Sequence, residues 1–105
     1  MSTRSKSVRL HPEARAELQE SVVFYRERAG EHWASRFKQR VAEGLQAIAS
    51  NPTRYPELSE FEGVRKIRLS QFPFSILYIT RAEYIWVVAI AHGNRRPDYW
   101  KARLL

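Results

Sequence analysis

Two amphipathic segments follow each other near the start of the chain with a single glycine between them, and this arrangement limits the fold more than any other feature. The segments run from Pro12 to about Ala29 and from about Glu31 to Ser50, with Gly30 between them. Apolar residues recur at every third or fourth position, at Ala14, Leu18, Val22, Tyr25 and Ala29 and then at Trp33, Phe37, Val41, Leu45 and Ile48. That period places them on one face of a helix. Two such helices joined by so short a turn predict an antiparallel helical hairpin.

The ends of the two predicted helices are marked by their residue types. Pro12 suits a first helical position, because its missing N–H would have no partner there, and Glu13 suits the positive end of the helix dipole. His11 is a poor N-cap residue. Asn51–Pro52 ends the second helix, since proline cannot continue a helix. The charged residues of the first helix lie mostly outside its apolar stripe, which predicts that they face solvent: Arg15, Glu17, Glu20, Glu27 and Arg28.

Four short segments have the composition and alternation of β-strands. They are Val8–Leu10 before the helices and Val64–Leu69, Pro73–Thr80 and Ile85–Ala91 after a polar loop. Arg81–Glu83 is short enough to be a hairpin loop. The last segment is apolar on both faces, which predicts a central strand buried on both sides. A central strand needs a second neighbour, and only the first strand is left, so we predict the order first, fourth, third, second.

These elements predict an α+β fold in a single domain spanning residues 1–105. An N-terminal strand precedes an αα-hairpin and a three-stranded antiparallel meander, with the helices on one face of the sheet. The chain has no cysteine, which excludes disulfides and thiol nucleophiles and fits a reducing compartment. The N-terminus lacks a signal-peptide pattern, and the longest apolar run, 84–91, falls short of the about 20 residues that span a bilayer. We therefore expect a cytoplasmic protein with no membrane partner.

Positive charge is concentrated in the second half of the chain. The formal net charge is +7, and residues 63–105 hold eight Lys or Arg against two acids, which gives this segment +6. Such a surface favours a nucleic acid, a machine bound to nucleic acid or an acidic protein partner. An ordinary solvated cationic surface is the alternative interpretation.

Four cations of this segment are candidates for one binding surface. Lys66 and Arg68 should share a face of their strand, and if the helices cover the opposite face they line an open concave surface. Arg95 and Arg96, which follow the last strand, could join them and bind phosphate through their guanidinium groups. The alternative is that these charges protect a sheet edge from aggregation.

Three further residues near the C-terminus have both a functional and a structural interpretation. His92 ends the predicted central strand, and it either moves a proton near neutral pH or caps the strand by hydrogen bonding to backbone. Tyr99 and Trp100 either stack on a target or close the core at the chain end; for Trp100 we expect the core. The chain has no P-loop, GxSxG or HExxH motif, and its three histidines do not form a metal-ligand pattern, so we expect neither a metal nor a cofactor.

Several short segments, in this order and spacing, resemble the RelE/ParE toxin superfamily, whose members are often labelled plasmid stabilisation proteins. They are Pro12–Leu18, Phe24–Tyr25, Asn51–Pro52, Tyr55–Pro56, Gly63–Arg65, Phe72–Tyr78 and Val88–Trp100. No single segment is specific, but together they extend from about Val8 to Arg103. The resemblance implies a helical hairpin packed on an antiparallel sheet. It also implies a type II toxin–antitoxin system, in which a cognate antitoxin wraps and neutralises the toxin and operator DNA is bound only through the antitoxin.

Two mechanisms occur in this superfamily. ParE-like members inhibit DNA gyrase by binding it, whereas RelE-like members cut mRNA on the ribosome with basic residues of the sheet and a C-terminal aromatic residue or histidine. In the RelE-like pattern an arginine stands where this chain has Ser75. A serine cannot supply the positive charge that stabilises a phosphoryl-transfer transition state. The resemblance therefore favours a ParE-like gyrase inhibitor that is not an enzyme, with a ribosome-dependent mRNA endonuclease as the alternative.

Each mechanism implies its own set of site residues. For gyrase binding, the predicted target contacts are Arg65, Lys66, Arg68, Arg95, Arg96, Tyr99 and Trp100. For the endonuclease, the predicted catalytic set is Lys66, Arg68, His92, Arg95 and Tyr99. A third interpretation is a non-toxic member that only binds its antitoxin.

Overall fold

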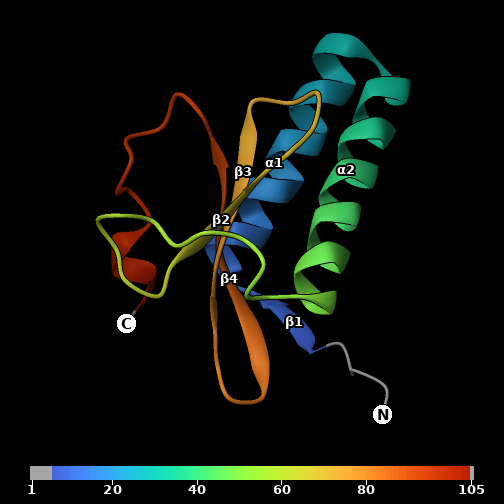
Figure 1. Ribbon diagram of the computed structural model, residues 1–105. Helices are drawn as coiled ribbons and strands as arrows, with labels where there is room; N and C mark the ends of the chain where they lie inside the picture. The colour runs from blue at the N-terminus through green and yellow to red at the C-terminus, as the bar shows by residue number, and fades with distance from the viewer. Residues whose placement is uncertain (1–5, 105) are drawn as a thin grey trace.

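The computed structural model describes residues 6–104, which form one sheet, two long helices and a C-terminal tail (Figure 1). The elements in chain order are β1 (Ser7–Leu10), α1 (Pro12–Ala29), α2 (Glu31–Ser50), β2 (Arg65–Arg68), β3 (Phe74–Thr80), β4 (Tyr84–His92) and a 3₁₀ helix η1 (Lys101–Leu104). The predicted α+β succession of one strand, a helical hairpin and three strands is confirmed. No helix within residues 6–104 is long and apolar enough to cross a membrane.

The two helices have the predicted bounds, and their ends show why. Gly30 lies between them with φ 97°, a conformation that favours glycine, and its N–H donates to the carbonyl oxygens of Tyr25 and Arg26. The prediction that His11 is a poor cap was wrong. Its imidazole Nδ1 accepts a hydrogen bond from the Glu13 N–H at 3.0 Å, so the ring does what a short hydroxyl or carboxylate side chain does at other N-caps.

Both apolar stripes face the sheet over most of their length, with these members buried: Ala14, Val22, Phe37, Val41 and Ile48. Ala29 and Trp33 were predicted to belong to the stripes but are exposed, because they flank the turn at Gly30, which extends past the strands (Figure 1). Gly44 is buried as well. A Cβ atom there would lie 2.8 Å from Cδ1 of Ile76, so the glycine lets α2 approach the sheet closely.

The strand order is β1-β4-β3-β2, as predicted. β4 pairs antiparallel with β3, and β3 pairs antiparallel with β2, which confirms the meander. β1 pairs parallel with β4, and this pairing ends at Leu10 and Val87. The rest of β4, residues 88–92, therefore has no strand on that side. A bulge between Leu77 and Tyr78 shifts the β3–β4 register beside Val87, where the pairing of β1 with β4 ends.

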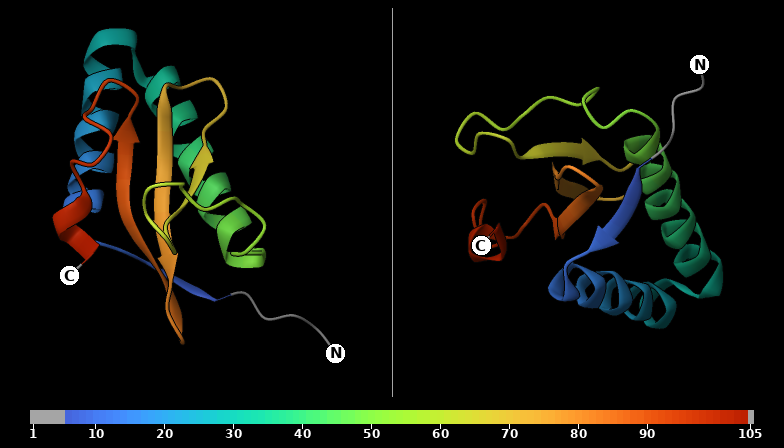
Figure 2. Two further views of the ribbon diagram at one scale, coloured as in Figure 1. Left: turned by 60° about the vertical axis from the view of Figure 1, so that its left-hand side comes forward. Right: turned by 90° about the horizontal axis from the view of Figure 1, so that it is seen from below.

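Each face of the sheet has its own core, and the two views of Figure 2 show the helices on one side and the loop and tail on the other. The helix-side core contains most of the buried residues, among them Phe37, Ile76 and Tyr78. The tail-side core is smaller and consists of Val64, Leu77, Val88, Ala89 and Trp100. β4 contributes to both cores, which confirms that it is central and buried on both sides.

Candidate functional site

A cavity opens where the tail-side face of the sheet meets the tail, and we call it the basic cavity. Its volume is about 260 Å3, and its lining includes three cations, Lys66, Arg95 and Arg96. Lys66 comes from β2, whereas the two arginines come from the tail, here defined as residues 93–104. Ser75, His92, Tyr99 and Trp100 also line it. The lining also includes Leu58, Glu60 and Phe61 of the loop before β2, so the structure brings together residues that lie up to 42 positions apart, from Leu58 to Trp100.

The strand register determines which basic residues of β2 reach the cavity. Lys66 pairs with Leu77 and Arg68 pairs with Ser75, and both side chains are exposed on the face away from the helices. Only Lys66 lines the cavity, whereas Arg68 lies on the same face outside the lining. Ser75, which stands where the RelE-like pattern has an arginine, lines the cavity without contributing a charge.

His92 ends β4 with its ring held by local contacts. Its Nδ1 accepts a hydrogen bond from the Asn94 N–H at 3.0 Å, and the ring meets Phe74 edge-on at 5.0 Å. This is the strand-capping arrangement, one of the two interpretations of this histidine. With Nδ1 accepting, the neutral ring carries its proton on Nε2.

Tyr99 organises the cations of the tail. The Arg95 guanidinium lies 3.9 Å from the centroid of the Tyr99 ring, close enough for a cation–π interaction. Arg96 is 81% exposed and makes a 3.5 Å ion pair with Asp98. The tail therefore presents one arginine that rests on an aromatic ring and one arginine that is exposed to solvent.

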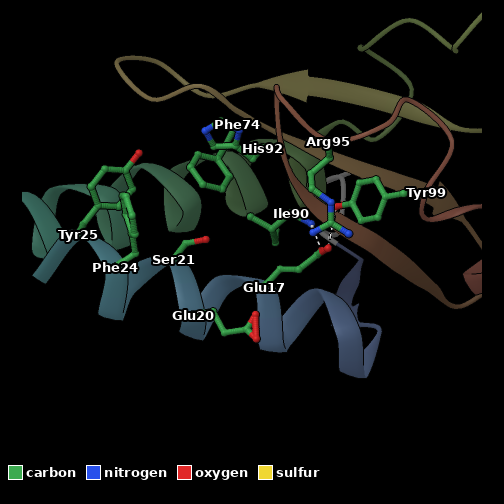
Figure 3. A pocket seen from close by; sticks show the side chains of 10 residues that line it. All are labelled: Glu17, Glu20, Ser21, Phe24, Tyr25, Phe74, Ile90, His92, Arg95 and Tyr99. Atoms are coloured by element: carbon green, nitrogen blue, oxygen red, sulfur yellow. Dashed lines mark hydrogen bonds between the residues drawn. The ribbon is translucent and has the colours of Figure 1, made fainter. Parts of the chain in front are cut away.

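A mostly buried carboxylate, that of Glu17, is hydrogen-bonded to Tyr99 and lines an edge pocket of about 390 Å3 between α1 and the end of β4, where β4 has no neighbouring strand on that side (Figure 3). Glu17 extends from α1 and is only 13% exposed. Its Oε1 accepts hydrogen bonds from the Ile90 N–H and from Arg103 Nη1, both at 3.0 Å. Its Oε2 accepts from the Tyr99 hydroxyl at 2.7 Å and from Arg103 Nη2 at 3.1 Å. One side chain thus joins α1, β4 and the tail.

Arg103 completes this network. Its side chain is 10% exposed, its Nε pairs with Glu13 at 3.0 Å, and its Nη1 also donates to the Val88 carbonyl at 3.0 Å. Burial opposes the charged form of Arg103, but the hydrogen bond and charge of Glu17 outweigh it and raise the arginine pKa. Burial, followed by the hydrogen bond to Glu17, raises the pKa of Tyr99 well above its usual range. Tyr99 therefore stays protonated and keeps donating to Glu17.

Two residues of the predicted target-contact set have structural partners within the protein. Arg65 donates to the carbonyl oxygens of Thr53 and Tyr55 and pairs with Glu57 at 3.5 Å, so it holds the loop after α2. Trp100 is 1% exposed and packs edge-on against Phe61 with ring centroids 4.9 Å apart, as expected for a core residue. Of the predicted set, Lys66, Arg95, Arg96 and Tyr99 remain together at the cavity.

The network around Glu17 and Arg103 was missed, because Glu17 was assigned to the solvent face of its helix. One local signal was present in the sequence. Glu17 follows Ala14, a member of the apolar stripe, by three positions, so it borders that stripe. Within residues 6–104, no group of three or more His, Asp or Glu side chains could hold a metal ion.

A third hollow lies on the hairpin, between α1 and α2, and we call it the hairpin groove. Its volume is about 420 Å3, and its lining is mostly apolar: Leu18, Gln19, Val22, Val23, Arg26, Lys38, Val41, Ala42 and Leu45. Val23 is 46% exposed, and the neighbouring Phe24 is 52% exposed. Exposed apolar surface of this kind, rimmed by Arg26 and Lys38, is typical of a protein interface.

Comparisons with known proteins agree with this architecture. A family model described as "ParE toxin of type II toxin-antitoxin system, parDE" matches residues 8–97. A chain of the chromosomal ParDE TA system from P. aeruginosa aligns with a TM-score of 0.75 and 22% sequence identity, and the alignment covers 86% of this chain and 98% of that chain. At this identity the likeness shows a shared fold. No curated protein sequence matches the chain significantly.

Proposed function

The chain belongs to the ParE toxin family of type II toxin–antitoxin systems, and from this membership we propose that it stops growth by binding DNA gyrase through the basic cavity. It is the toxin of such a pair, and its partner is the cognate antitoxin. The proposal makes the toxin a binding protein whose effect comes from occupying its target.

The observation that carries the proposal is the convergence of Lys66, Arg95 and Arg96 on one concave surface. Two of these side chains come from the tail and one from β2, so the cluster exists only in the folded protein. Within residues 6–104, neither Lys66 nor Arg95 pairs with a carboxylate. Their charge is thus available to an acidic surface, as complementary association requires.

The same geometry argues against mRNA cleavage, the alternative mechanism. Cleavage needs a proton acceptor and fixed positive charge at the phosphate. Lys66, His92 and Arg95 of the predicted catalytic set line the cavity. However, Ser75 brings no charge where the RelE-like pattern has an arginine, and Arg68 lies outside the lining. The Tyr99 hydroxyl donates a hydrogen bond to Glu17. Because its pKa is raised, it stays protonated at neutral pH and cannot accept a proton there. These features favour binding over catalysis.

A supercoiling assay tests the proposal directly. Purified toxin should block gyrase supercoiling of relaxed plasmid or trap cleaved DNA, and the double substitution Arg95→Ala with Arg96→Ala should weaken this effect at least about tenfold. Arg81→Ala is the matched control, because Arg81 is an exposed cation in the β3–β4 turn, at the other end of β4 from the cavity. Gyrase that is unaffected by excess toxin would contradict the proposal. Toxin-dependent cuts within codons of translated mRNA would establish the alternative.

We assign the hairpin groove to the antitoxin. An amphipathic segment could place its apolar side chains among those of Leu18, Val22 and Leu45. Acidic residues flanking those anchors would meet Arg26 and Lys38 at the rim of the groove. This arrangement leaves the basic cavity, on the other side of the sheet, to the target.

A further inference from the structure

We propose that Glu17 is a positioning residue of this toxin: it holds Tyr99 so that the ring presents Arg95 to the target, without touching the target itself. The inference rests on the proposed role of the basic cavity. It adds a residue of α1 to a site that otherwise consists of sheet, loop and tail residues.

The first support is that the Glu17 carboxylate is fully engaged inside the protein. Each oxygen accepts two hydrogen bonds, and the donors are the Ile90 N–H, the Tyr99 hydroxyl and two nitrogens of Arg103. A side chain that is 13% exposed and bonded in this way has no capacity left for a partner. Its role must therefore be exerted through the groups that it holds.

The second support is that Glu17 and Glu13 provide the polar attachment of the tail to the helices. Among residues 6–104, every hydrogen bond or ion pair between residues 93–104 and either helix ends on one of these two carboxylates. Only Glu17 reaches Tyr99. The backbone hydrogen bonds of the tail are mostly local, such as those from Arg95 to His92 and from Tyr99 to Arg96. They do not determine where the Tyr99 ring lies relative to the cavity.

The third support links Tyr99 to Arg95. The guanidinium of Arg95 lies 3.9 Å from the Tyr99 ring centroid, and within the described residues it has no carboxylate partner. The ring is thus the main contact that orders this long side chain. Arg103, at 5.0 Å from the same ring, is itself held by Glu17. Loss of the carboxylate would therefore release both the ring and the arginine that rests on it.

The main variant replaces Glu17 and Arg103 together by methionine. Removing Arg103 alone would leave the Glu17 charge without an ion pair, and removing Glu17 alone would leave Arg103 with only the more exposed Glu13. Trp100 should still dock the tail, so the variant should fold. Tyr99→Phe is the milder variant, since it removes the hydroxyl that Glu17 holds but keeps the ring. Glu20→Gln is the matched control. Glu20 is an exposed glutamate on the same helix beside the same pocket (Figure 3).

The first readout is independent of any target. In the wild type, the ring current of Tyr99 should shift the side-chain protons of Arg95 upfield in NMR spectra. We expect this shift to disappear in the Glu17→Met, Arg103→Met variant, to shrink in Tyr99→Phe and to persist in Glu20→Gln. A shift that persists in the double variant would overturn the proposal, whether or not gyrase is the target.

The second readout is the effect on the target. The double variant should raise the toxin concentration for half-maximal gyrase inhibition about tenfold. In toxin that already carries Arg95→Ala, the same two substitutions should raise this concentration by less than about twofold. Full additivity of the two effects would show a general loss of structure and would overturn the proposal. If wild-type toxin arrests growth without inhibiting gyrase, the proposed function fails. Growth arrest then becomes the readout, and the effect of the double variant is again compared with and without Arg95→Ala.

Discussion

Replacing Trp100 by alanine tests whether docking of the tail stabilises the fold, and the expected loss can be worked from its surroundings. The side chain is 1% exposed and packs in the tail-side core against Val64, Leu77 and Val88, with Phe61 edge-on at 4.9 Å. Loss of a buried aromatic side chain costs about 3–5 kcal/mol. We expect a loss of about 3 kcal/mol in the free energy of unfolding, at the lower end of this range. The tail covers this core from one side only, so it can shift and partly fill the cavity that the indole leaves. For a domain of this size that corresponds to a fall in Tm of about 12–24 °C.

Urea unfolding followed by circular dichroism measures this loss without depending on tryptophan fluorescence. Trp33→Ala is the matched control, because the same side chain is removed from a position that is 42% exposed. We expect the control to cost less than about 1 kcal/mol. If Trp100→Ala cost no more than Trp33→Ala, the tail would not be packed on the sheet, and the basic cavity would lose the wall that carries Arg95 and Arg96.

Three further changes test other parts of the structure. Gly44→Ala places a methyl group 2.8 Å from Cδ1 of Ile76, and an overpacking cost of about 1–3 kcal/mol should exceed the helix-propensity gain of about 1 kcal/mol. The urea midpoint should therefore fall, and a rise would show that α2 can move away from the sheet. Burial raises the pKa of Tyr78 from 10.0 to about 12, and its hydroxyl donates to the Pro52 carbonyl at 2.6 Å. Because the folded state holds this proton more tightly, the free energy of unfolding should fall as pH rises from 10.0 towards about 12. Tyr78→Phe should cost about 1 kcal/mol at neutral pH and flatten that alkaline decline; an unchanged slope would contradict the assignment. Val23→Glu adds a charge to the hairpin groove at a position that is 46% exposed, so stability should change by less than about 0.5 kcal/mol. Its affinity for the antitoxin, measured by calorimetry, should fall at least about tenfold, and unchanged affinity would place the antitoxin elsewhere.

The elements and the strand order could be predicted from the sequence because each depends on a local pattern. The helix bounds followed from apolar spacing and from Pro12, Gly30 and Asn51, and they agree with the structure. The strand order followed from one observation, that Ile85–Ala91 is apolar on both faces and so must be central. Exposure at the hairpin turn was not predictable in this way, because periodicity does not show where a helix extends past the sheet.

The site was predicted less completely, because its decisive contacts join distant parts of the chain. Glu17 bonds to Ile90, Tyr99 and Arg103, which lie 73, 82 and 86 positions later. A helical pattern compares a residue only with neighbours within a turn or two, so it assigned Glu17 to solvent. Charge alone also could not separate Lys66, which lines the cavity, from Arg65, which is held by carbonyl oxygens of the preceding loop.

The two surfaces that we assign to the antitoxin and to the target belong to different layers of the molecule. The hairpin groove lies between the helices, whereas the basic cavity lies on the opposite face of the sheet. An antitoxin that filled only the groove would leave Lys66 and Arg96 accessible. The edge pocket connects the two layers, since it is lined by Phe24 and Tyr25 of α1 and also by Arg95, as well as by His92 and Tyr99 (Figure 3). We therefore expect the antitoxin to block the target site with a segment that continues from the groove past Phe24 into this pocket, where it would meet the arginine that rests on Tyr99.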